Sequence, residues 1–570
     1  MHLPINDPSA PRQPSHRDPS RASDLAVGHL RVFRGWDYAG FGVLTALAWA
    51  ALAWCLAAWF TQADWRVHPI LLGSLTLFLA YHVAIQQCRW WLLPVMRRPT
   101  PRPPHAGWHV AVATTFVPGA ESLEMLEDTV KALVAMAYPH DTWVLDEGDD
   151  GEVNALCTRL GARHFSRKPF AHYQTSRGPF QARSKHGNYN AWLEACGLAP
   201  YNILVNFDPD HVPEPTFLHQ VLGYFDDPRV GYVQAAQAYY NQRASFIARG
   251  AAEETYAYYS VTQMASYAMG LPIVTGCHTA HRVEALQEVG GFAPHDADDL
   301  LITYHYRAAG WQGVYVPKIL ARGLTPVDWA GHLTQQRRWA RSVLDIKLKR
   351  YPTFAGRLSP GACLLGGLHG LYYLQGLTAG MGVGLLAYLL ASGHVPQLFV
   401  DGTLWRWLGL QAVLWVVESY RQRFFLDRRR EWGLHWRAGL LRWAKWPYVG
   451  LALLEVLRGR RHAYGITRKV RTSATSAMVV RAHLPVVLLL GLAWLTSVIR
   501  WGAIPAALHL WTAGLVVATF AMMWTERGAF PAPYDPQLWA CEARRRVNGV
   551  NMDSMGSVKN MQETGRASYV

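Results

Sequence analysis

The sequence is divided into a central polar block and two flanking regions rich in long hydrophobic segments. Tyr38 to Phe60 has 23 residues without a charged side chain, about 35 Å as a helix and long enough to cross a bilayer core. Pro69 to Ile85 is a second, shorter span. The basic residues Arg97, Arg98 and Arg102 that follow it place the next segment in the cytoplasm. The chain is therefore expected to be a membrane protein with a large domain inserted between its spans.

Four more spans are expected after the polar block. The second of them is the weakest, because it contains Arg406 and Glu418. The four segments are Leu364 to Leu390, Trp405 to Tyr420, Leu484 to Ile499 and Trp501 to Trp524. The apolar stretch from Trp432 to Leu457 is interrupted by three basic residues and has basic loops at both ends, which predicts an interfacial amphipathic helix. Six spans place both termini in the cytoplasm.

Composition supports a membrane protein and argues against nucleic acid as a partner. Hydrophobic residues make up 51% of the 570 residues, and 25 Trp exceed the usual content of a soluble enzyme. The net charge of +15 comes from Lys and Arg beside the hydrophobic spans, as expected of loops that contact anionic membrane lipids. The seven cysteines form no CxxC pair, so neither a zinc site nor a disulfide framework is indicated.

The polar block alternates strand-like and helix-like segments, which predicts an α/β architecture. The runs HVAVATTF, DTWVLDEG and YNILVNFDPD read as strands, and Asp146, Asp208 and Asp210 stand at strand exits. In open α/β sheets the carboxyl ends of strands border the ligand site, so these carboxylates are expected to converge there. For Asp146 alone, a turn or helix cap remains an equal interpretation.

Asp208 and Asp210 are separated by one residue and can face a hard cation and the diphosphate that it bridges. Mg²⁺ or Mn²⁺ prefers such oxygen ligands. Asp299 precedes the helical pattern LLITYHYRAAGW and can either cap that helix or act as a general base that deprotonates an acceptor hydroxyl.

The QQRRW segment offers three side chains on one helical face, because Gln335, Arg338 and Trp339 are spaced at i, i+3 and i+4. An indole can stack on a sugar ring, and a guanidinium can neutralise a leaving diphosphate. The same face could instead pack at the membrane interface.

In this order, the motifs resemble the processive, membrane-embedded branch of glycosyltransferase family 2, and most closely the catalytic subunit of bacterial cellulose synthase. KHGNYN (Lys185 to Asn190) resembles the family's KAGNLN element, and DPDH resembles its DADH. YGITRK, with Thr467 and Lys469, resembles the family's FxVTxK gating loop. A basic cytoplasmic linker is the alternative interpretation of that loop.

The resemblance implies a GT-A fold and an inverting transfer from a UDP-sugar, with UDP-glucose as the expected donor, to a growing β-linked polysaccharide that passes through the membrane. It implies Mg²⁺ or Mn²⁺ as cofactor, held by Asp208 and Asp210. It implies an accessory export subunit as a partner and a location in the inner (plasma) membrane, with the catalytic domain in the cytoplasm. Donor contacts would come from eight residues: Asp146, Lys185, Asp208, Asp210, Gln335, Arg338, Thr467 and Lys469.

By the same resemblance, Asp299 would be the catalytic base and Trp339 would stack on the acceptor. The family's FFCGS-like element is VTGCHT here, so Cys277 and His278 are expected to line an altered acceptor region. The family's TED triplet is ADD, which keeps the carboxylate of Asp299. A non-processive enzyme that adds one sugar to a membrane lipid is the alternative function, and a non-catalytic scaffold or channel is a third.

These expectations divide the chain into seven parts. They are a disordered cytoplasmic tail (1–36), two membrane helices (37–91), a GT-A domain (105–350), an interfacial segment with two membrane helices (351–430), an interfacial helix with the gating loop (431–475), two membrane helices (480–526) and a cytoplasmic tail (527–570). The last tail is too short for the PilZ barrel found in many relatives, so activity independent of cyclic-di-GMP is expected.

Overall fold

The computed structural model describes residues 26–62, 66, 68–395, 403–460, 476–502 and 505–525. The expected gating loop with Thr467 and Lys469, the first 25 residues and the C-terminal tail lie outside these residues. The end of the expected N-terminal tail is ordered, because β1 (His29–Arg31) pairs antiparallel with β2 (Arg97–Pro99). Phe33 is also buried, which attaches this segment to the body of the protein.

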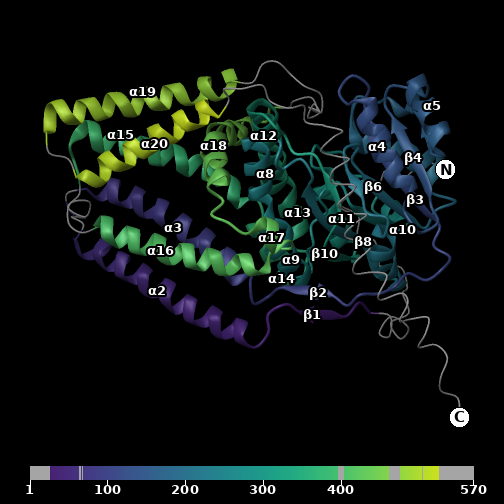
Figure 1. Ribbon diagram of the computed structural model, residues 1–570, viewed down its shortest axis with the longest axis horizontal. Helices are drawn as coiled ribbons and strands as arrows, with labels where there is room; N and C mark the ends of the chain where they lie inside the picture. Colours follow the sequence, from purple (N-terminus) through teal and green to yellow (C-terminus); the bar gives the residue numbers. More distant parts are fainter. Residues whose placement is uncertain are drawn as a thin grey trace, which may run out of the picture.

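The polar block forms an α/β domain around a mixed sheet of eight strands (Figure 1). Their order is β5-β4-β3-β6-β9-β8-β10-β7, with β9 antiparallel to both of its neighbours and β7 antiparallel to β10. The three strands expected from the sequence are β3, β4 and β6. The strand bounds are β3 Val110–Phe116, β4 Asp141–Asp146, β5 Arg163–Phe165, β6 Ile203–Phe207, β7 Val212–Pro213, β8 Val230–Tyr239, β9 Thr279–Arg282 and β10 Gln312–Gly323.

Helices pack on both faces of this sheet, and several begin at side chains that cap them. Ser122 caps α4, Asp150 caps α5 and Ser184 caps α6 by accepting hydrogen bonds from the first turn. The helices of the domain are α4 Leu123–Val134, α5 Gly151–Leu160, α6 Lys185–Trp192, α7 Phe217–Val221, α8 Phe246–Ala257, α9 Gln263–Ala268, α10 Val283–Glu288, α11 Asp298–Ala308, α12 Trp329–Asp345 and α13 Tyr351–Ala355.

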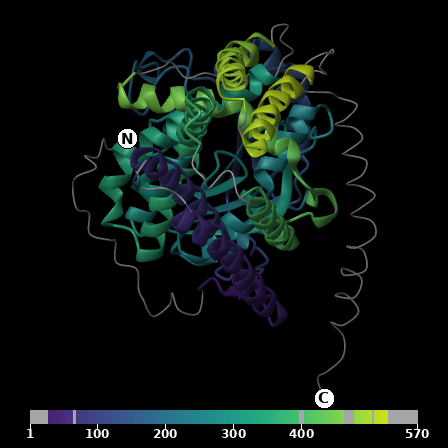
Figure 2. The same ribbon diagram turned by 90° about the vertical axis from the view of Figure 1, so that its left-hand side faces the viewer.

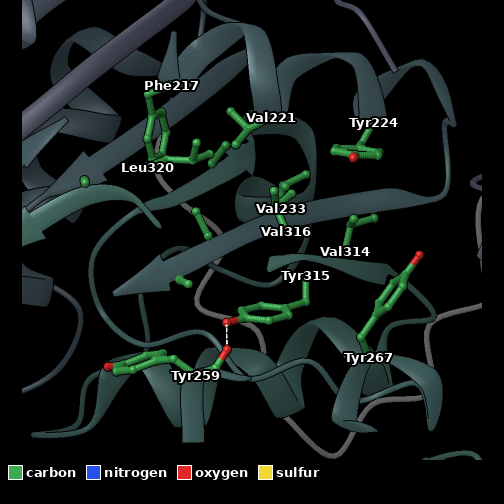
Figure 3. Close-up of a cluster of buried hydrophobic side chains, with 14 of the residues drawn as sticks. Phe217, Val221, Tyr224, Val233, Tyr259, Tyr267, Val314, Tyr315, Val316 and Leu320 are labelled. Atoms are coloured by element: carbon green, nitrogen blue, oxygen red, sulfur yellow. Dashed lines mark hydrogen bonds between the residues drawn. The ribbon is translucent and has the colours of Figure 1, made fainter. Parts of the chain in front are cut away.

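The largest hydrophobic core lies beneath β8 and β10, where the strands meet the helices that approach the membrane region (Figure 3). Val233 of β8 and Val314 and Val316 of β10 are buried there. The Tyr315 hydroxyl donates to the backbone carbonyl of Tyr259, so the strand is connected directly to the helical segment after α8. This core packs the sheet against the helices that lead to the membrane region.

The remaining helices form a second body beside the domain, and Figure 2 views the molecule from their end. Their bounds are α2 Trp36–Gln62, α3 Pro69–Trp91, α14 Pro360–Leu368, α15 Gln375–Ser392, α16 Thr403–Arg421, α17 Arg428–Glu431, α18 Trp436–Leu457, α19 Ser476–Trp501 and α20 Ala506–Trp524. Large apolar side chains project from them, with Leu492 65% and Val517 64% exposed. Exposed apolar surface of this extent indicates contact with lipid.

Five described segments are long and apolar enough to cross a membrane: Trp36–Thr61, Pro69–Trp91, Pro360–Ser392, Arg481–Trp501 and Ala506–Trp524. They match five of the six expected spans. The sixth expected span is α16, a helix of 19 residues that packs beside α2. It contains Arg406 and Glu418 and is not among the five apolar segments. The expected interfacial segment is α18, which packs against α8 and α12 of the domain and α15 of the second body.

Candidate active site

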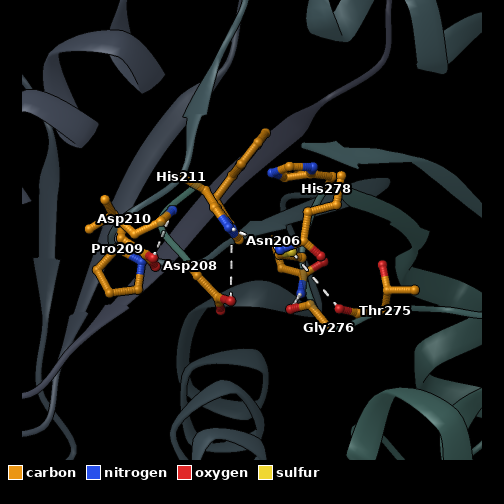
Figure 4. Close-up of polar contacts among 12 residues, drawn as sticks. Asn206, Asp208, Pro209, Asp210, His211, Thr275, Gly276 and His278 are labelled. Carbon is orange, nitrogen blue, oxygen red and sulfur yellow. Dashed lines mark hydrogen bonds and ion pairs between the residues drawn. The ribbon is translucent and has the colours of Figure 1, made fainter. Parts of the chain in front are cut away.

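The sheet itself brings two loops of the expected site together. Strand β6 ends at Phe207, directly before Asp208, while β9 runs antiparallel beside it and begins directly after His278. The His278 amide donates to the carbonyl of Asn206, and the Asn206 side chain donates to the carbonyl of Gly276 (Figure 4). The DPDH and TGCH motifs are therefore held against each other by backbone pairing.

Asp208, Asp210 and His211 offer ligand atoms that all lie within 4.8 Å of one another. Asp208 is half-buried, whereas Asp210 is buried and accepts a hydrogen bond of 3.2 Å from the Leu324 amide. Two carboxylates and an imidazole in this arrangement suit Mg²⁺ or Mn²⁺, because the oxygen ligands are those that hard cations prefer. The donor set thus fits the expected metal.

Lys185 connects the KHGNYN motif to this acidic pair. Its ammonium lies 2.5 Å from Asp208 Oδ1 and 2.6 Å from the carbonyl of Gly276. Although burial disfavours a charged ammonium, the Asp208 carboxylate raises the pKa of Lys185 well above its usual value. A permanent cation therefore lies beside the proposed metal site, where a diphosphate would bind.

The rest of the KHGNYN motif holds Lys185 in place. A Cβ on Gly187 would lie 2.3 Å from the Gln181 carbonyl and 2.6 Å from Arg167, so only glycine fits this position without a shift. The Asn190 amide donates to the carbonyl of Phe292, and its oxygen accepts from the Phe292 amide. The other residues of the motif thus pack closely and hold the lysine in position.

Asp299 stands in the first turn of α11, with its carboxylate against Gly276, where a Cβ would come within 3.2 Å of it. Its Oδ1 accepts from the amide of the next residue, Leu300, at 2.7 Å, whereas the N-cap of α11 is Ala297, so Asp299 is not the capping residue that was its alternative interpretation. Burial raises the pKa of Asp299, while the Leu300 amide, Lys185 and Arg338 oppose that shift. A carboxylate with a raised pKa is better suited to accept a proton.

Asp298, which sequence reasoning left without a role, adjoins this group. Burial, and then the charge of Asp299, raise the pKa of Asp298 to about 7. The two adjacent carboxyl groups therefore titrate as a pair rather than separately. The signal in the sequence was the DD doublet itself, since two neighbouring acids that share a buried site cannot both ionise freely.

Gln335, Arg338 and Trp339 of α12 all line one cavity. Asp328 caps the helix by accepting from the Gly331 amide at 2.7 Å, which fixes its start. Trp339 is 36% exposed to that cavity, so its ring surface is available for stacking.

A single cavity of about 1550 Å³ joins these groups. Its wall at the domain contains Lys185, Asp208, Asp210, Cys277, Asp298, Asp299, Gln335, Arg338 and Trp339. Its wall continues along α3, α16 and α18, so the same space extends from the acidic loops to the helices of the second body.

Of the expected site residues that the structure describes, two are not part of that wall. Asp146 is fully buried at the end of β4, where its carboxylate accepts from the amides of Gly148 at 2.8 Å and Asp150 at 2.5 Å and lies 3.2 Å from His164. It therefore performs the turn-forming role that was the alternative interpretation, while Glu147 and Gly148 line the cavity beside it.

His278 is the second residue outside the wall. It is buried behind the loop, with its ring centroid 5.6 Å from that of Phe207 and 4.7 Å from that of His211. Burial, and then the charge of His211, lower the pKa of His278 well below its usual value, so the ring is neutral. Its neighbour Cys277 does line the cavity, and burial raises the pKa of the Cys277 thiol well above its usual value.

An ion pair that the sequence did not predict joins two loops beside the cavity. The fully buried Arg167 donates to both oxygens of Glu147, at 2.9 and 2.7 Å, and to the carbonyl of Gln181 at 3.0 Å. This pair joins the loop after β4 to the loop before α6, which carries Lys185. The partners are 20 residues apart in sequence and stand in no recognisable motif.

Part of this domain is similar to known glycosyltransferases. Residues 111–342 match the family described as "Glycosyltransferase like family 2". The chain is 27% identical over 319 residues to Cellulose synthase 1 of Komagataeibacter xylinus, a match that covers 54% of this chain and 19% of that protein. It is 26% identical over 315 residues to the cellulose synthase catalytic subunit (UDP-forming) of Xanthomonas axonopodis pv. citri, covering 53% of this chain and 41% of that protein.

Less than half of either relative is therefore matched by this chain. Among solved structures, a mannosyltransferase of Pyrobaculum calidifontis in complex with GDP-Man and Mn²⁺ is 18% identical, with 73% of this chain and 100% of that chain covered and a TM-score of 0.44.

Proposed function

Because residues 111–342 form a glycosyltransferase family 2 domain of GT-A type, we propose that the chain transfers sugar from a UDP-sugar, UDP-glucose first, to a growing β-linked polysaccharide. The observation that carries the proposal is the cavity of about 1550 Å³, which joins the acidic loops to the membrane helices. The two curated relatives named above, both cellulose synthases, support the choice of a UDP-sugar and a polymer product.

In the proposed roles, Asp208 and Asp210 hold Mg²⁺ or Mn²⁺, with His211 beside them. The ion, when bound, offsets the negative charge of the donor diphosphate. Lys185 and Arg338 contribute two further cations on the same cavity wall, positioned to neutralise the departing UDP. Gln335 on the same face of α12 supplies an amide for hydrogen bonds to a hydroxyl or phosphate.

The proposed base is Asp299. An acceptor hydroxyl attacks the anomeric carbon as its proton passes to the Asp299 carboxylate, the bond between that carbon and the diphosphate oxygen breaks, and UDP leaves with the bonding electrons. Attack opposite the leaving group inverts an α-linked donor to a β-linked product. Trp339 stacks on the acceptor sugar and holds its hydroxyl toward Asp299.

We place the domain in the cytoplasm, where UDP-sugars are made, and the spans in the inner membrane. The growing polymer would leave along the cavity toward α3, α16 and α18, which line its far side. An accessory export subunit would receive it on the other face.

The proposal is tested with the full chain in lipid nanodiscs containing Mg²⁺ or Mn²⁺. A panel of UDP-sugars is screened for UDP release, and the best labelled donor is used to measure product length. We expect release with one or a few donors and a long product that a β-glycanase degrades. A single labelled sugar on extracted lipid would instead support the lipid glycosyltransferase, and absence of release with every donor would contradict transfer from a UDP-sugar.

A further inference from the structure

The membrane end of the cavity is lined by basic side chains from three helices. Arg89 stands in the last turn of α3, Arg421 ends α16, and Arg442 and Lys445 belong to α18 (Figure 1). Arg421 and Arg442 are close enough to Arg89 to repel it electrostatically. Three guanidinium groups therefore converge on one part of the cavity.

The carboxylates of this region are already paired. Glu254 accepts from Lys445 at 2.8 and 2.9 Å, and Glu418 accepts from Arg421 at 2.7 Å. Glu253 is paired with Arg437 at 3.2 Å. These are the acidic residues of the described chain that line the cavity near the three helices.

Two of these cations form no hydrogen-bonded ion pair among the described residues, although Glu418 is close enough to Arg89 to favour its charge. Arg89 has a ring contact, 5.8 Å from the centroid of Tyr372, and the Nε of Arg442 donates to the backbone carbonyl of Ala438 at 3.3 Å. Arg89 is half-buried and Arg442 is exposed, and both line the cavity. Arginine stays protonated in both settings, and the partly buried charge of Arg89 is costly without a partner. A wall with two such charges is suited to bind an anionic ligand.

The same part of the cavity has aromatic surfaces suited to a glycan. Tyr372, Tyr373 and Trp415 line it, and the space is continuous with Trp339, the proposed acceptor platform. Aromatic faces bind sugar rings, and a guanidinium fork matches a carboxylate in two parallel hydrogen bonds. Both features are needed for a charged sugar, whereas a neutral glucan would leave the two cations unmatched.

We propose that the acceptor glycan carries carboxylate groups, as a polymer containing uronic acid does, and that Arg89 and Arg442 bind one of them beyond Trp339. The inference rests on the proposed glycosyl transfer and specifies the class of its acceptor; because a growing chain is its own acceptor, it also requires a UDP-uronic acid among the donors in place of UDP-glucose alone. An anionic lipid headgroup has related chemistry and is separated from a glycan by the experiment below.

The test measures binding and therefore does not depend on turnover. The full chain in nanodiscs of zwitterionic lipid is titrated calorimetrically with a β-1,4-linked glucose hexamer and with the corresponding glucuronic acid hexamer. We expect the acidic hexamer to bind about ten-fold or more tightly, because hydrogen bonds between charged groups contribute more than those between neutral groups. The preference should shrink as salt is raised.

Arg89→Gln and Arg442→Gln should each remove most of that preference. Arg429→Gln, which changes an exposed arginine of α17 outside the cavity wall, should retain it. UDP binding is measured for every variant to show that the domain is folded. Arg89→Lys and Arg442→Lys keep the charge and should retain part of the preference.

Equal affinity of the unmodified chain for the two hexamers, or binding of neither, would overturn the inference. So would a preference that survives both glutamine variants. Loss of the preference in nanodiscs containing phosphatidylglycerol would assign the arginines to lipid instead. If UDP itself fails to bind, the proposed function fails; if UDP binds without an acidic preference, only this inference fails.

Discussion

The domain end of the cavity and its membrane end differ in the sign of the charge that prevails on their walls. At the domain end, Lys185 pairs with Asp208, but Asp210, Asp298 and Asp299 add further acid to the same wall. At the membrane end, each carboxylate named above is paired, and Arg89 and Arg442 are left over. An excess of acid suits a metal ion and proton transfer, and an excess of base suits an anionic ligand.

The largest effect should come from the domain end. Asp299→Asn removes the proposed base and should lower the rate of sugar transfer about a hundred-fold to ten-thousand-fold while UDP affinity changes little. Initial rates and calorimetric UDP binding measure the two quantities. Asp226→Asn, which changes an acid outside the cavity wall, is the control and should leave both unchanged. Near-normal transfer by Asp299→Asn would remove the base assignment.

A substitution at the membrane end should change the stability of the protein more than the rate of sugar transfer. Lys445→Met leaves the carboxylate of Glu254, whose side chain is 10% exposed, without its ammonium partner and should lower the free energy of unfolding by about 3 to 5 kcal/mol. Thermal unfolding followed by size exclusion of the purified chain measures the loss. In the double variant with Glu254→Gln most of it should return, because no unpaired charge remains. An equal loss in the single and double variants would mean that the ion pair is not responsible.

The pH dependence of sugar transfer should follow the titration of the acidic pair at the domain end. The pKa of Asp298 is raised to about 7, and that of Asp299 is raised as well, so the pair takes up a proton as the pH falls through this region. The base form is then lost, and transfer should fall about ten-fold per pH unit below the pair's pKa. Asp298→Asn removes the neighbouring charge and should move the decline to lower pH. A profile unchanged by Asp298→Asn would argue against the coupling.

Trp339 lies between the two ends of the cavity, and Trp339→Ala should have the smallest effect of these substitutions. Loss of one stacking surface should weaken acceptor binding about two-fold to ten-fold and shorten the product, while UDP binding stays unchanged. Product length is measured by size-exclusion chromatography of labelled polymer. Trp432→Ala, an exposed tryptophan outside the cavity wall, is the matched control. Products of equal length from both variants would contradict the stacking role.

The sequence could predict the domain end because its residues stand in local patterns. Strand runs followed by acids located Asp208, and helical spacing placed Gln335, Arg338 and Trp339 on one face. The same strand-exit rule placed Asp146 among the ligands, but its carboxylate turns back to cap its own loop. That choice depends on side-chain direction, which a strand pattern does not specify.

The membrane end could not be predicted in this way. Arg89 and Arg442 are separated by more than 350 positions, and in isolation the first reads as a basic residue at the end of a span and the second as one of the basic residues that interrupt an interfacial helix. Only the packing of α3 and α18 around one cavity brings the two arginines onto the same wall, where neither forms an ion pair with a carboxylate among the described residues. The status of α16 was likewise uncertain from its sequence, since Arg406 and Glu418 reduce its apolar character.

The most direct test of the central claim is a structure of the full chain with UDP and Mn²⁺ bound, in which anomalous scattering locates the metal. The account predicts one Mn²⁺ at Asp208 and Asp210, with the diphosphate between that ion, Lys185 and Arg338, and the open side of the cavity leading past Trp339 to the membrane helices. Manganese or UDP bound in any other cavity, with Asp299 remote from the diphosphate, would contradict it.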